Sequence, residues 1–346
     1  MATTTPEKSA TLLSWRRHQF PLDWRVQFGR AAPLHLEIGF GDGRYTAARA
    51  AARPEEDFVG LEISMASLQR ALRRIRQAEL PNVRLIKLGA EFAVRHLFAP
   101  QALATITVNF PDPWPKERHQ RNRLLNQRFF RLAASRLATG GAVLLATDHP
   151  DYLAFARAEA AATGLYLSRE AEPPPEVLKT KYALKWQAQG KPLFYHIFAV
   201  LHPPLEALAP LERSETMPHA LLSGTLPDPL TIEKLVIPYS GGYVILHEAL
   251  QSLSDPQRLL VRVTVDEPEL QQQLLVEVQR RGPGELIVKL SPFGDPVVTE
   301  AVHGAVHAVT EWLLTLSTEL RVVSRAYRGS SSEKIREKSG EEREIE

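Results

Sequence analysis

The chain has 346 residues, 44% of them hydrophobic, which suits about two globular domains. It contains no cysteine, which excludes disulfide frameworks, cysteine-ligated zinc fingers and thiol nucleophiles. No apolar run is long enough to cross a bilayer, and Met1–Ser9 lacks the apolar core of a signal peptide. We therefore expect a cytoplasmic protein that does not associate with membranes.

The net charge of +2 hides an asymmetry along the chain. Residues 1–210 contain 28 Lys and Arg against 19 Asp and Glu, whereas residues 226–325 contain 8 against 13. This asymmetry predicts that only the first part contacts a polyanion such as a nucleic acid. The arginine-rich surface of a heat-adapted protein would give the same pattern, so charge alone leaves both interpretations open.

Short apolar runs alternate with helical stretches from Leu34 to Leu201, a pattern typical of a doubly wound α/β sheet. The predicted strands are Leu34–Gly39, Phe58–Glu62, Val83–Leu88, Thr105–Phe110, Ala142–Thr147 and Phe194–Leu201. The predicted crossover helices, rich in Ala, Leu and Arg, are Arg44–Arg53, Ser64–Glu79, Asn122–Ala138 and Pro150–Thr163.

A second, smaller α+β domain is predicted beyond two proline-containing stretches, Leu201–Pro210 and Met217–Pro229. Its predicted elements are strands at Tyr243–His247, Leu259–Val265, Leu274–Gln279 and Leu286–Leu290 and a helix at about Pro296–Thr318. We therefore expect a first domain at 1–212, a linker at 213–229, a second domain at 230–327 and a disordered charged tail at 328–346.

Glycines and one acidic residue predict a nucleotide site at the end of the first strand. Gly39, Gly41 and Gly43 lie between that strand and the first helix, where glycine permits a tight turn and a helix N-terminus offers free N–H groups. Glu62 ends the second strand, where a carboxylate can accept hydrogen bonds from ribose hydroxyls. A tight turn without a ligand is the alternative.

The residues around the turn favour S-adenosylmethionine over a nicotinamide dinucleotide. Arg44 stands where the dinucleotide fingerprint requires glycine or alanine. Glu37 would repel a pyrophosphate but could bind an ammonium group. S-adenosylmethionine carries an ammonium group and no phosphate.

A stiff loop after the fourth strand predicts the substrate site. It has three prolines in the run Phe110-Pro111-Asp112-Pro113-Trp114-Pro115, and a basic stretch follows from Lys116 to Arg123. The loop comes at the carboxyl end of a parallel strand, where ligands bind in such sheets. Asp112 would be displayed in nearly fixed geometry, and Arg118, Arg121 and Arg123 could contact phosphates. The alternative is a proline-rich surface loop with a solvated basic run.

This loop resembles the signature of the bacterial tRNA (guanine-N7-)-methyltransferases, and the resemblance covers roughly residues 30–200. The glycine turn, Glu62, Thr147-Asp148 and Thr180-Lys181-Tyr182 follow in the order of that family. The resemblance implies a Rossmann-like, seven-stranded class I methyltransferase domain that acts on tRNA, with Asp112 central to catalysis. It implies that Glu37 and Glu62 contact the cofactor and that Lys116, Asp148 and the Thr180 segment face the substrate. Together with the glycine turn and the end of the third strand, the expected S-adenosylmethionine contacts are Glu37, Gly39, Gly41, Gly43, Glu62, Gly89, Ala90 and Asp112. Together with the basic run, the expected substrate contacts are Lys116, Arg118, His119, Arg121, Asp148, Thr180, Lys181, Tyr182 and Ala183.

The chain departs from the family pattern at two places. Gly89-Ala90 stands where the family has Asp or Asn before an alanine near the adenine, so Glu91 would have to supply that contact. Ala183 stands where the family has a glutamate, which affects the expected recognition of guanine.

Other interpretations of single residues stay open. Asp148 could be an acid at a helix N-terminus, His119 a surface histidine rather than a proton carrier, and Thr180 and Tyr182 loop residues. Trp15 to Phe20 could bind single-stranded RNA or pack on the core.

Guanine N7 already has a free lone pair, so we expect electrostatic and positional catalysis without a general base and without a metal. The rivals are a methyltransferase for a protein or small molecule and an inactive tRNA-binding or assembly subunit. We expect a monomer or homodimer.

Overall fold

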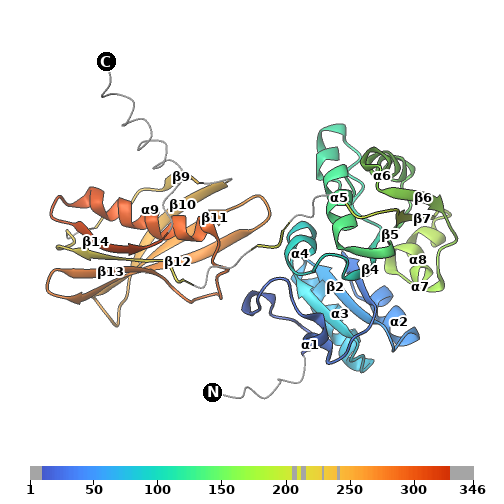
Figure 1. Cartoon of the computed structure of the whole chain (residues 1–346), viewed down its shortest axis with the longest axis horizontal. Coiled ribbons are helices and arrows are strands. Elements are labelled where there is room, and N and C mark those ends of the chain that lie inside the picture. Colours follow the sequence, from blue (N-terminus) through green and yellow to red (C-terminus); the bar gives the residue numbers. More distant parts are fainter. Residues whose placement is uncertain (1–9, 205–208, 212–215, 228–229, 240–241, 328–346) are drawn as a thin grey trace. The chain divides into compact units, whose positions relative to one another are not determined.

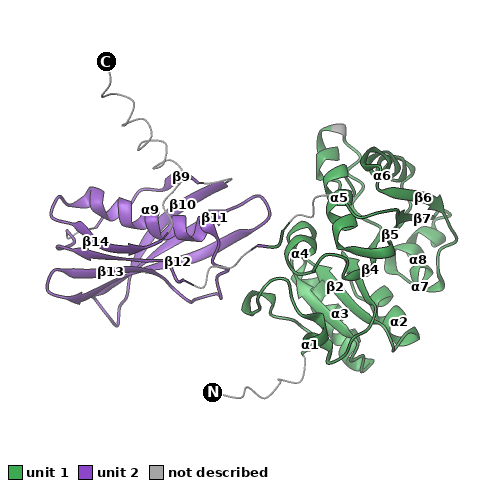
Figure 2. Ribbon diagram, in the orientation of Figure 1, with its two compact units in different colours: residues 1–210 green, residues 211–346 purple. Residues whose placement is uncertain are grey.

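The computed structural model describes residues 10–204, 209–211, 216–227, 230–239 and 242–327. It divides into two compact units, residues 1–210 and residues 211–346 (Figure 2). The charged tail predicted at 328–346 lies outside the described residues. None of the helices in the described ranges is long and apolar enough to cross a membrane.

Unit 1 is built on a seven-stranded sheet in the order β3-β2-β1-β4-β5-β7-β6 (Figure 1). The strands β1 to β5 are parallel, and β7 lies antiparallel between β5 and β6. The bounds are β1 Leu34–Ile38, β2 Asp57–Glu62, β3 Val83–Lys87, β4 Leu103–Asn109, β5 Leu137–Thr147, β6 Tyr166–Glu170 and β7 Phe194–Val200. The predicted seven-stranded Rossmann-like fold is confirmed.

Two groups of helices accompany this sheet, one of α4, α5 and α6 and the other of α2, α3 and α7. In α3 the buried residues Leu68, Ala71 and Ile75 recur every three to four positions, and Ser64 caps its N-terminus. The bounds are α1 Trp24–Phe28, α2 Arg44–Ala52, α3 Met65–Gln77, α4 Ala90–His96, α5 Gln127–Arg136, α6 Pro150–Thr163, α7 Pro175–Leu178 and α8 Lys181–Ala188, with 3-10 turns η1 Trp15–Arg17 and η2 Glu117–Asn122.

The N-terminal segment packs on unit 1. The Trp15 side chain is 6% exposed, and its ring centroid lies 5.2 Å from that of Phe92. The backbone N–H of Leu13 donates a hydrogen bond to the carbonyl oxygen of Leu85, which extends the edge at β3. These contacts favour the core-packing interpretation of this segment over the RNA-binding one.

Unit 2 is an antiparallel sheet of seven strands, β14-β8-β13-β12-β11-β10-β9, with helix α9 against one face (Figure 1). Alternate strand residues such as Val261, Val263 and Val265 join Val302 and Val309 of α9 in a separate core. The bounds are β8 His219–Ser223, β9 Leu235–Tyr239, β10 Gly242–Gln251, β11 Arg258–Asp266, β12 Gln271–Gly282, β13 Glu285–Leu290, β14 Arg321–Ala326 and α9 Glu300–Leu316. The predicted α+β architecture is confirmed.

The linker predicted at 213–229 is wrong for residues His219–Ser223, which form β8. This strand pairs with β13 on one side and β14 on the other, so it is internal to the sheet. The strand has only five residues, too few for a convincing apolar alternation, and the flanking prolines Pro218 and Pro227 favour a linker.

Candidate active site

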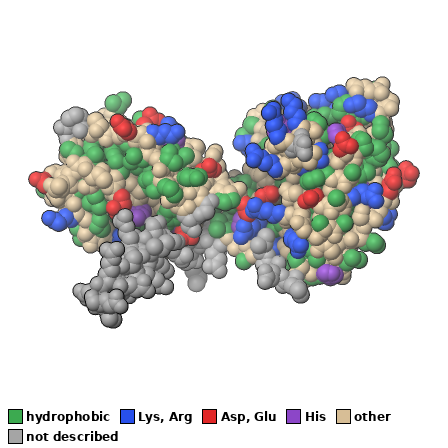
Figure 3. Space-filling model, turned by 90° about the horizontal axis from the view of Figure 1, so that it is seen from above, with side chains coloured by type: hydrophobic (Ala, Val, Ile, Leu, Met, Phe, Trp, Pro, Cys, Tyr) green, Lys and Arg blue, Asp and Glu red, His purple; other side chains and the backbone are tan. Residues whose placement is uncertain are grey.

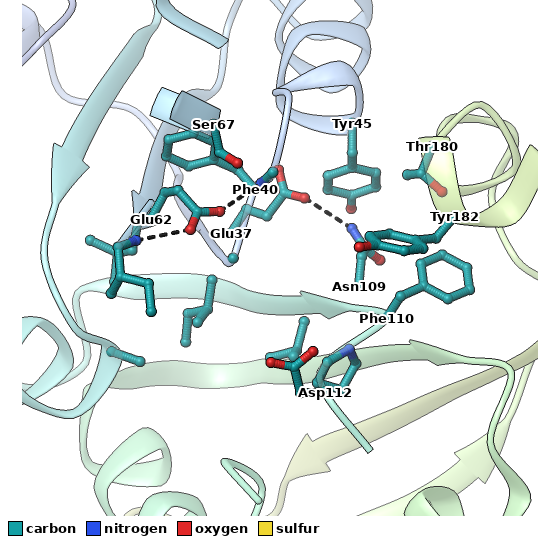
Figure 4. A pocket seen from close by; sticks show the side chains of 18 of the residues that line it. Glu37, Phe40, Tyr45, Glu62, Ser67, Asn109, Phe110, Asp112, Thr180 and Tyr182 are labelled. Carbon is teal, nitrogen blue, oxygen red and sulfur yellow. Dashed lines mark hydrogen bonds between the residues drawn. The ribbon is translucent and has the colours of Figure 1, made fainter. Parts of the chain in front are cut away.

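A cavity of about 750 Å³ opens at the carboxyl ends of the parallel strands. The chain order reverses between β1 and β4, and such a switch point is where ligands bind in open α/β sheets. The volume is within the usual range for small-molecule sites. The cavity is lined by the glycine turn, the ends of β2 and β4, the proline loop and the start of α8 (Figure 4). Its predicted residues are Glu37, Gly39, Gly41, Glu62, Ala90, Asp112, Thr180, Lys181 and Tyr182.

The glycines of the turn have different physical roles. Gly39 and Gly41 have φ of +71° and +58°, and a Cβ on either would meet no atom within 4 Å, so the space in front of them is free for a ligand. Gly43 does not line the cavity. A Cβ on Gly43 would lie 2.6 Å from the Cβ of Ala71, so this glycine is required for α2 to approach α3.

Glu62 holds the turn against the end of β2. One carboxylate oxygen accepts a hydrogen bond from the backbone N–H of Gly41, 3.0 Å away (Figure 4). The other accepts from the N–H groups of Ile63 and Ser64 at 2.9 and 3.0 Å. The oxygen that accepts from Gly41 keeps a second lone pair that can accept from a ligand hydroxyl. The residue thus fixes the shape of the cavity wall as well as facing the cavity.

Glu37 and Asn109 form a buried polar pair on neighbouring strands. The Glu37 side chain accepts hydrogen bonds from the hydroxyl of Thr46 and, at 3.1 Å, from the Asn109 amide (Figure 4). Burial raises the pKa of Glu37 to about 7, although both hydrogen bonds oppose the shift. The Oδ1 atom of Asn109 is buried and has no hydrogen-bond partner among the described residues.

The proline loop is held in an unusual backbone conformation. Phe110 and Trp114 have φ of +53° and +42°, a backbone region that residues other than glycine rarely occupy. Asp112 lies between them, is exposed and lines the cavity. No dashed line reaches Asp112 in Figure 4, and it stands apart from the Glu37–Asn109 pair.

The expected phosphate contact by Arg123 is wrong. Its side chain is 3% exposed and donates from Nε to the carbonyl oxygen of Pro113 at 2.9 Å. The guanidinium carbon lies 4.9 Å from the ring centroid of Phe155. A segment rich in prolines lacks N–H donors, so a buried arginine supplies the donor that the loop carbonyls need.

Helix α8 brings the Thr180 segment to the cavity. The Thr180 hydroxyl accepts from the N–H of Ala183 at 3.2 Å, which caps the helix. Lys181 and Tyr182 are exposed and line the cavity, and the Tyr182 ring lies beside Phe110 with centroids 6.2 Å apart. The Ala183 side chain is fully buried, so the expectation that it contacts the substrate is wrong.

The remaining predicted residues lie outside the cavity wall. Lys116, Arg118 and Arg121 are exposed after the loop, and His119 packs edge-on against Trp114 at 5.9 Å. Asp148 follows β5, and its carboxylate lies 3.8 Å from the Lys191 ammonium. Gly89 precedes α4 and does not line the cavity, whereas its neighbours Leu88 and Ala90 do.

Sequence reasoning missed Asn109 as a site residue. It stands last in β4, next to β1, and parallel strand ends meet at one edge of a sheet, so its position could have paired it with Glu37. Tyr45 and Arg70 also line the cavity, and no motif marks them. Arg44, which argues against a dinucleotide in the sequence, lines the cavity as well. Among the described residues, no group of three or more His, Asp or Glu side chains could hold a metal ion.

The comparisons with known proteins first define the class. Residues 31–196 match a family described as putative methyltransferases, a range that spans the glycine turn, the proline loop and α8. Such a match agrees with the Rossmann-like sheet and with the cavity at its switch point.

Three relatives then define the family. A tRNA (guanine-N(7)-)-methyltransferase of Thermus thermophilus is 46% identical and covers 86% of this chain and 94% of its own length. Enzymes of the same name from Deinococcus radiodurans and Thermotoga maritima are 42% and 31% identical, cover 81% and 85% of this chain, and are covered over 89% and 94% of their own lengths. The chain belongs to the tRNA (guanine-N(7)-)-methyltransferase family.

The relatives also share the second unit. The Thermus match extends over 299 residues, which is longer than the whole of residues 1–210. The similarity therefore continues into the antiparallel sheet, beyond the roughly 30–200 that the sequence motifs covered.

Proposed function

We propose that this chain transfers a methyl group from S-adenosylmethionine to N7 of a guanine in tRNA, and that the guanine lies in the variable loop. The observation that carries the proposal is the 46% identity to a tRNA (guanine-N(7)-)-methyltransferase over 86% of the chain. The cavity chemistry is compatible with it.

The cavity residues fit S-adenosylmethionine. The buried Glu37 and the unpartnered Oδ1 of Asn109 offer acceptors to an ammonium group, while Glu62 offers a carboxylate to ribose hydroxyls. The open space before Gly39 and Gly41 leaves room for the ligand. The cofactor would supply an electrophilic methyl group on its sulfonium.

Asp112 is the residue we assign to catalysis. Guanine N7 attacks with its own lone pair, so the protein needs no base there, and methylation leaves a positive charge on the purine. The exposed Asp112 carboxylate at the cavity wall could face that charge or accept hydrogen bonds from N1–H and N2–H of the base. Either role uses a carboxylate held by a stiff loop.

The exposed basic residues support the proposal that the substrate is tRNA. Lys116, Arg118 and Arg121 follow the loop and are free to meet phosphates. On the face in Figure 3, Lys and Arg side chains gather over unit 1 more than over unit 2, as the residue counts of the two parts suggest. A cytoplasmic location and a monomeric or homodimeric state stay predictions.

One assay tests the function. The full chain is incubated with labelled S-adenosylmethionine and an unmodified tRNA transcript, and the product is cleaved chemically at 7-methylguanine. We expect label in the tRNA and a single cleavage in the variable loop. Label elsewhere in the tRNA would overturn the position. Label only in protein or small molecules would favour the first rival, and tRNA binding without label would favour an inactive binding subunit.

A further inference from the structure

Two lysines lie against one tryptophan ring at the end of α8. The Lys185 ammonium is 4.4 Å from the Trp186 ring centroid, and the Lys191 ammonium is 3.7 Å from it. The backbone supports this arrangement, since the N–H of Lys191 donates to the carbonyl oxygen of Trp186 at 3.0 Å. Cation–π contacts at these distances restrict two side chains that are otherwise flexible.

This group lies one helical turn from the candidate active site. Tyr182 lines the cavity, and Trp186 follows it by four residues on the same helix. The two rings are stacked with centroids 6.4 Å apart and planes 26° apart. An RNA strand whose base enters the cavity past Tyr182 would bring its neighbouring phosphates over this turn of α8.

The acidic residues nearby do not neutralise the lysines. Asp148 lies 3.8 Å from Lys191, and both side chains are partly exposed, so this ion pair is weak. Glu176, on the preceding helix, is engaged by Arg49 and Arg53 at 3.9 and 3.4 Å. In the described ranges no carboxylate lies within ion-pair distance of Lys185, which is exposed.

The stability of the fold does not by itself explain why two lysines lie against one tryptophan ring. Two ammonium groups held by one ring repel each other, and each gives up side-chain entropy to stay there. A phosphate between the two ammonium groups would relieve their repulsion. Because the lysine side chains are already ordered in the free protein, RNA binding would not lose further entropy to order them.

We propose that Lys185 and Lys191 bind RNA phosphates next to the guanine that enters the cavity, and that Trp186 is the positioning residue that holds both lysines in place. This inference rests on the proposed function, because it concerns the tRNA bound at that same site.

The test is the salt dependence of tRNA binding, measured on the full chain with an unmodified transcript and S-adenosylhomocysteine present. Log affinity falls as log salt rises, and removing two phosphate contacts should make the slope shallower by about 1.4 to 1.8. We expect this for the double variant Lys185→Gln, Lys191→Gln, together with a higher KM for tRNA and a kcat within about twofold of wild type.

Trp186 variants separate positioning from charge. Trp186→Leu keeps both lysines, so the salt slope should stay while affinity falls roughly two- to tenfold. Trp186→Phe keeps an aromatic face and should restore affinity to within about twofold of wild type. If Phe and Leu behave alike, the positioning role is overturned.

A matched control removes two exposed lysines elsewhere, Lys87→Gln with Lys234→Gln, and should leave the slope at the wild-type value. The phosphate-binding role of Lys185 and Lys191 is overturned if their double variant has the wild-type slope while wild type methylates tRNA. If wild type itself neither binds nor methylates tRNA, the proposed function fails instead. Thermal melting of each variant shows whether it is folded. If Trp186→Leu does not fold, the double lysine variant still tests the phosphate contacts.

Discussion

Arg123 lies ten residues after Pro113 in the chain, and its guanidinium Nε donates a 2.9 Å hydrogen bond to the Pro113 carbonyl oxygen. The same guanidinium reaches the carbonyl oxygen of Trp114 at 3.5 Å. The loop that presents Asp112 is therefore held by a buried arginine as well as by its prolines. The geometry of the candidate catalytic carboxylate depends on a residue that does not touch the cavity.

We predict that Arg123→Ala lowers kcat for tRNA methylation at least tenfold and destabilises the protein by roughly 1–3 kcal/mol. The loop carbonyls lose their donor, and Asp112 loses its fixed position. Steady-state kinetics and thermal unfolding measure the two effects. The salt slope of tRNA binding should not change, because the side chain is buried.

Arg121→Ala is the matched control. Arg121 is exposed, so its loss should reduce the salt slope by about one phosphate contact and leave kcat nearly unchanged. A reduced slope for Arg123→Ala with normal kcat would mean that Arg123 leaves its buried position to bind phosphate.

A second prediction concerns Asp112→Asn. The variant keeps the shape of the side chain and loses its charge, so we expect methyl transfer to fall by about 10²-fold or more with unchanged affinity for S-adenosylmethionine. Single-turnover kinetics and calorimetry measure these quantities. Turnover within a factor of two of wild type would show that the carboxylate charge is not needed.

Much of the fold follows from the sequence because the buried strands are strongly apolar. The predicted and observed bounds of β1 to β3 differ by at most one residue at each end. The edge strand β6 was missed because four of its five residues are exposed, so no apolar run marks it. Helix α8 was missed because it is short and only Ala183 is buried.

The site was less predictable than the fold. The glycines identify the turn, and its place at the end of β2 identifies Glu62, because the local geometry requires these residue types there. Burial of Arg123 and of Ala183 depends on packing against other elements, which spacing along the chain does not reveal. Exposure of Arg121 and burial of Arg123 two positions later illustrate this difference.

Glu62→Ala should weaken S-adenosylmethionine binding about tenfold or more, with a smaller effect on kcat at saturating cofactor. The carboxylate would no longer meet ribose, and the N–H groups of Gly41, Ile63 and Ser64 would lose their acceptor. Calorimetry measures the affinity. An unchanged dissociation constant would remove Glu62 from the cofactor site.

The pH dependence of cofactor binding should report on Glu37. Its pKa is raised to about 7 by burial, so the folded protein holds this proton more tightly than the unfolded chain does. The contribution of Glu37 to stability is therefore complete below about pH 4.5 and is lost as pH rises to about 7.

An ammonium ligand prefers the ionised carboxylate, so the affinity of the wild type should rise roughly fivefold from about pH 6 to about pH 7. Glu37→Gln cannot ionise, and its affinity should be lower and flat over this interval. Calorimetry at several pH values measures both proteins. A wild-type profile parallel to that of the Gln variant would show that the proton on Glu37 does not control binding.

The last prediction concerns unit 2. We predict that a chain ending at Pro210 folds, binds S-adenosylmethionine with the affinity of the full chain and methylates the same guanine. Every residue of the cavity lies before Ala183, and unit 2 has a core of its own around α9. The acidic balance of residues 226–325 makes that region a poor general contact for RNA.

Circular dichroism, calorimetry and mapping of the methylated base measure the three expectations on the truncated chain, with the full chain as control. A higher KM for some tRNAs at equal kcat would assign unit 2 to the choice of tRNA. A truncated chain that is folded and binds the cofactor normally but transfers no methyl group would contradict the prediction. Unit 2 would then take part in placing the tRNA for catalysis, which is compatible with its presence in the Thermus, Deinococcus and Thermotoga relatives.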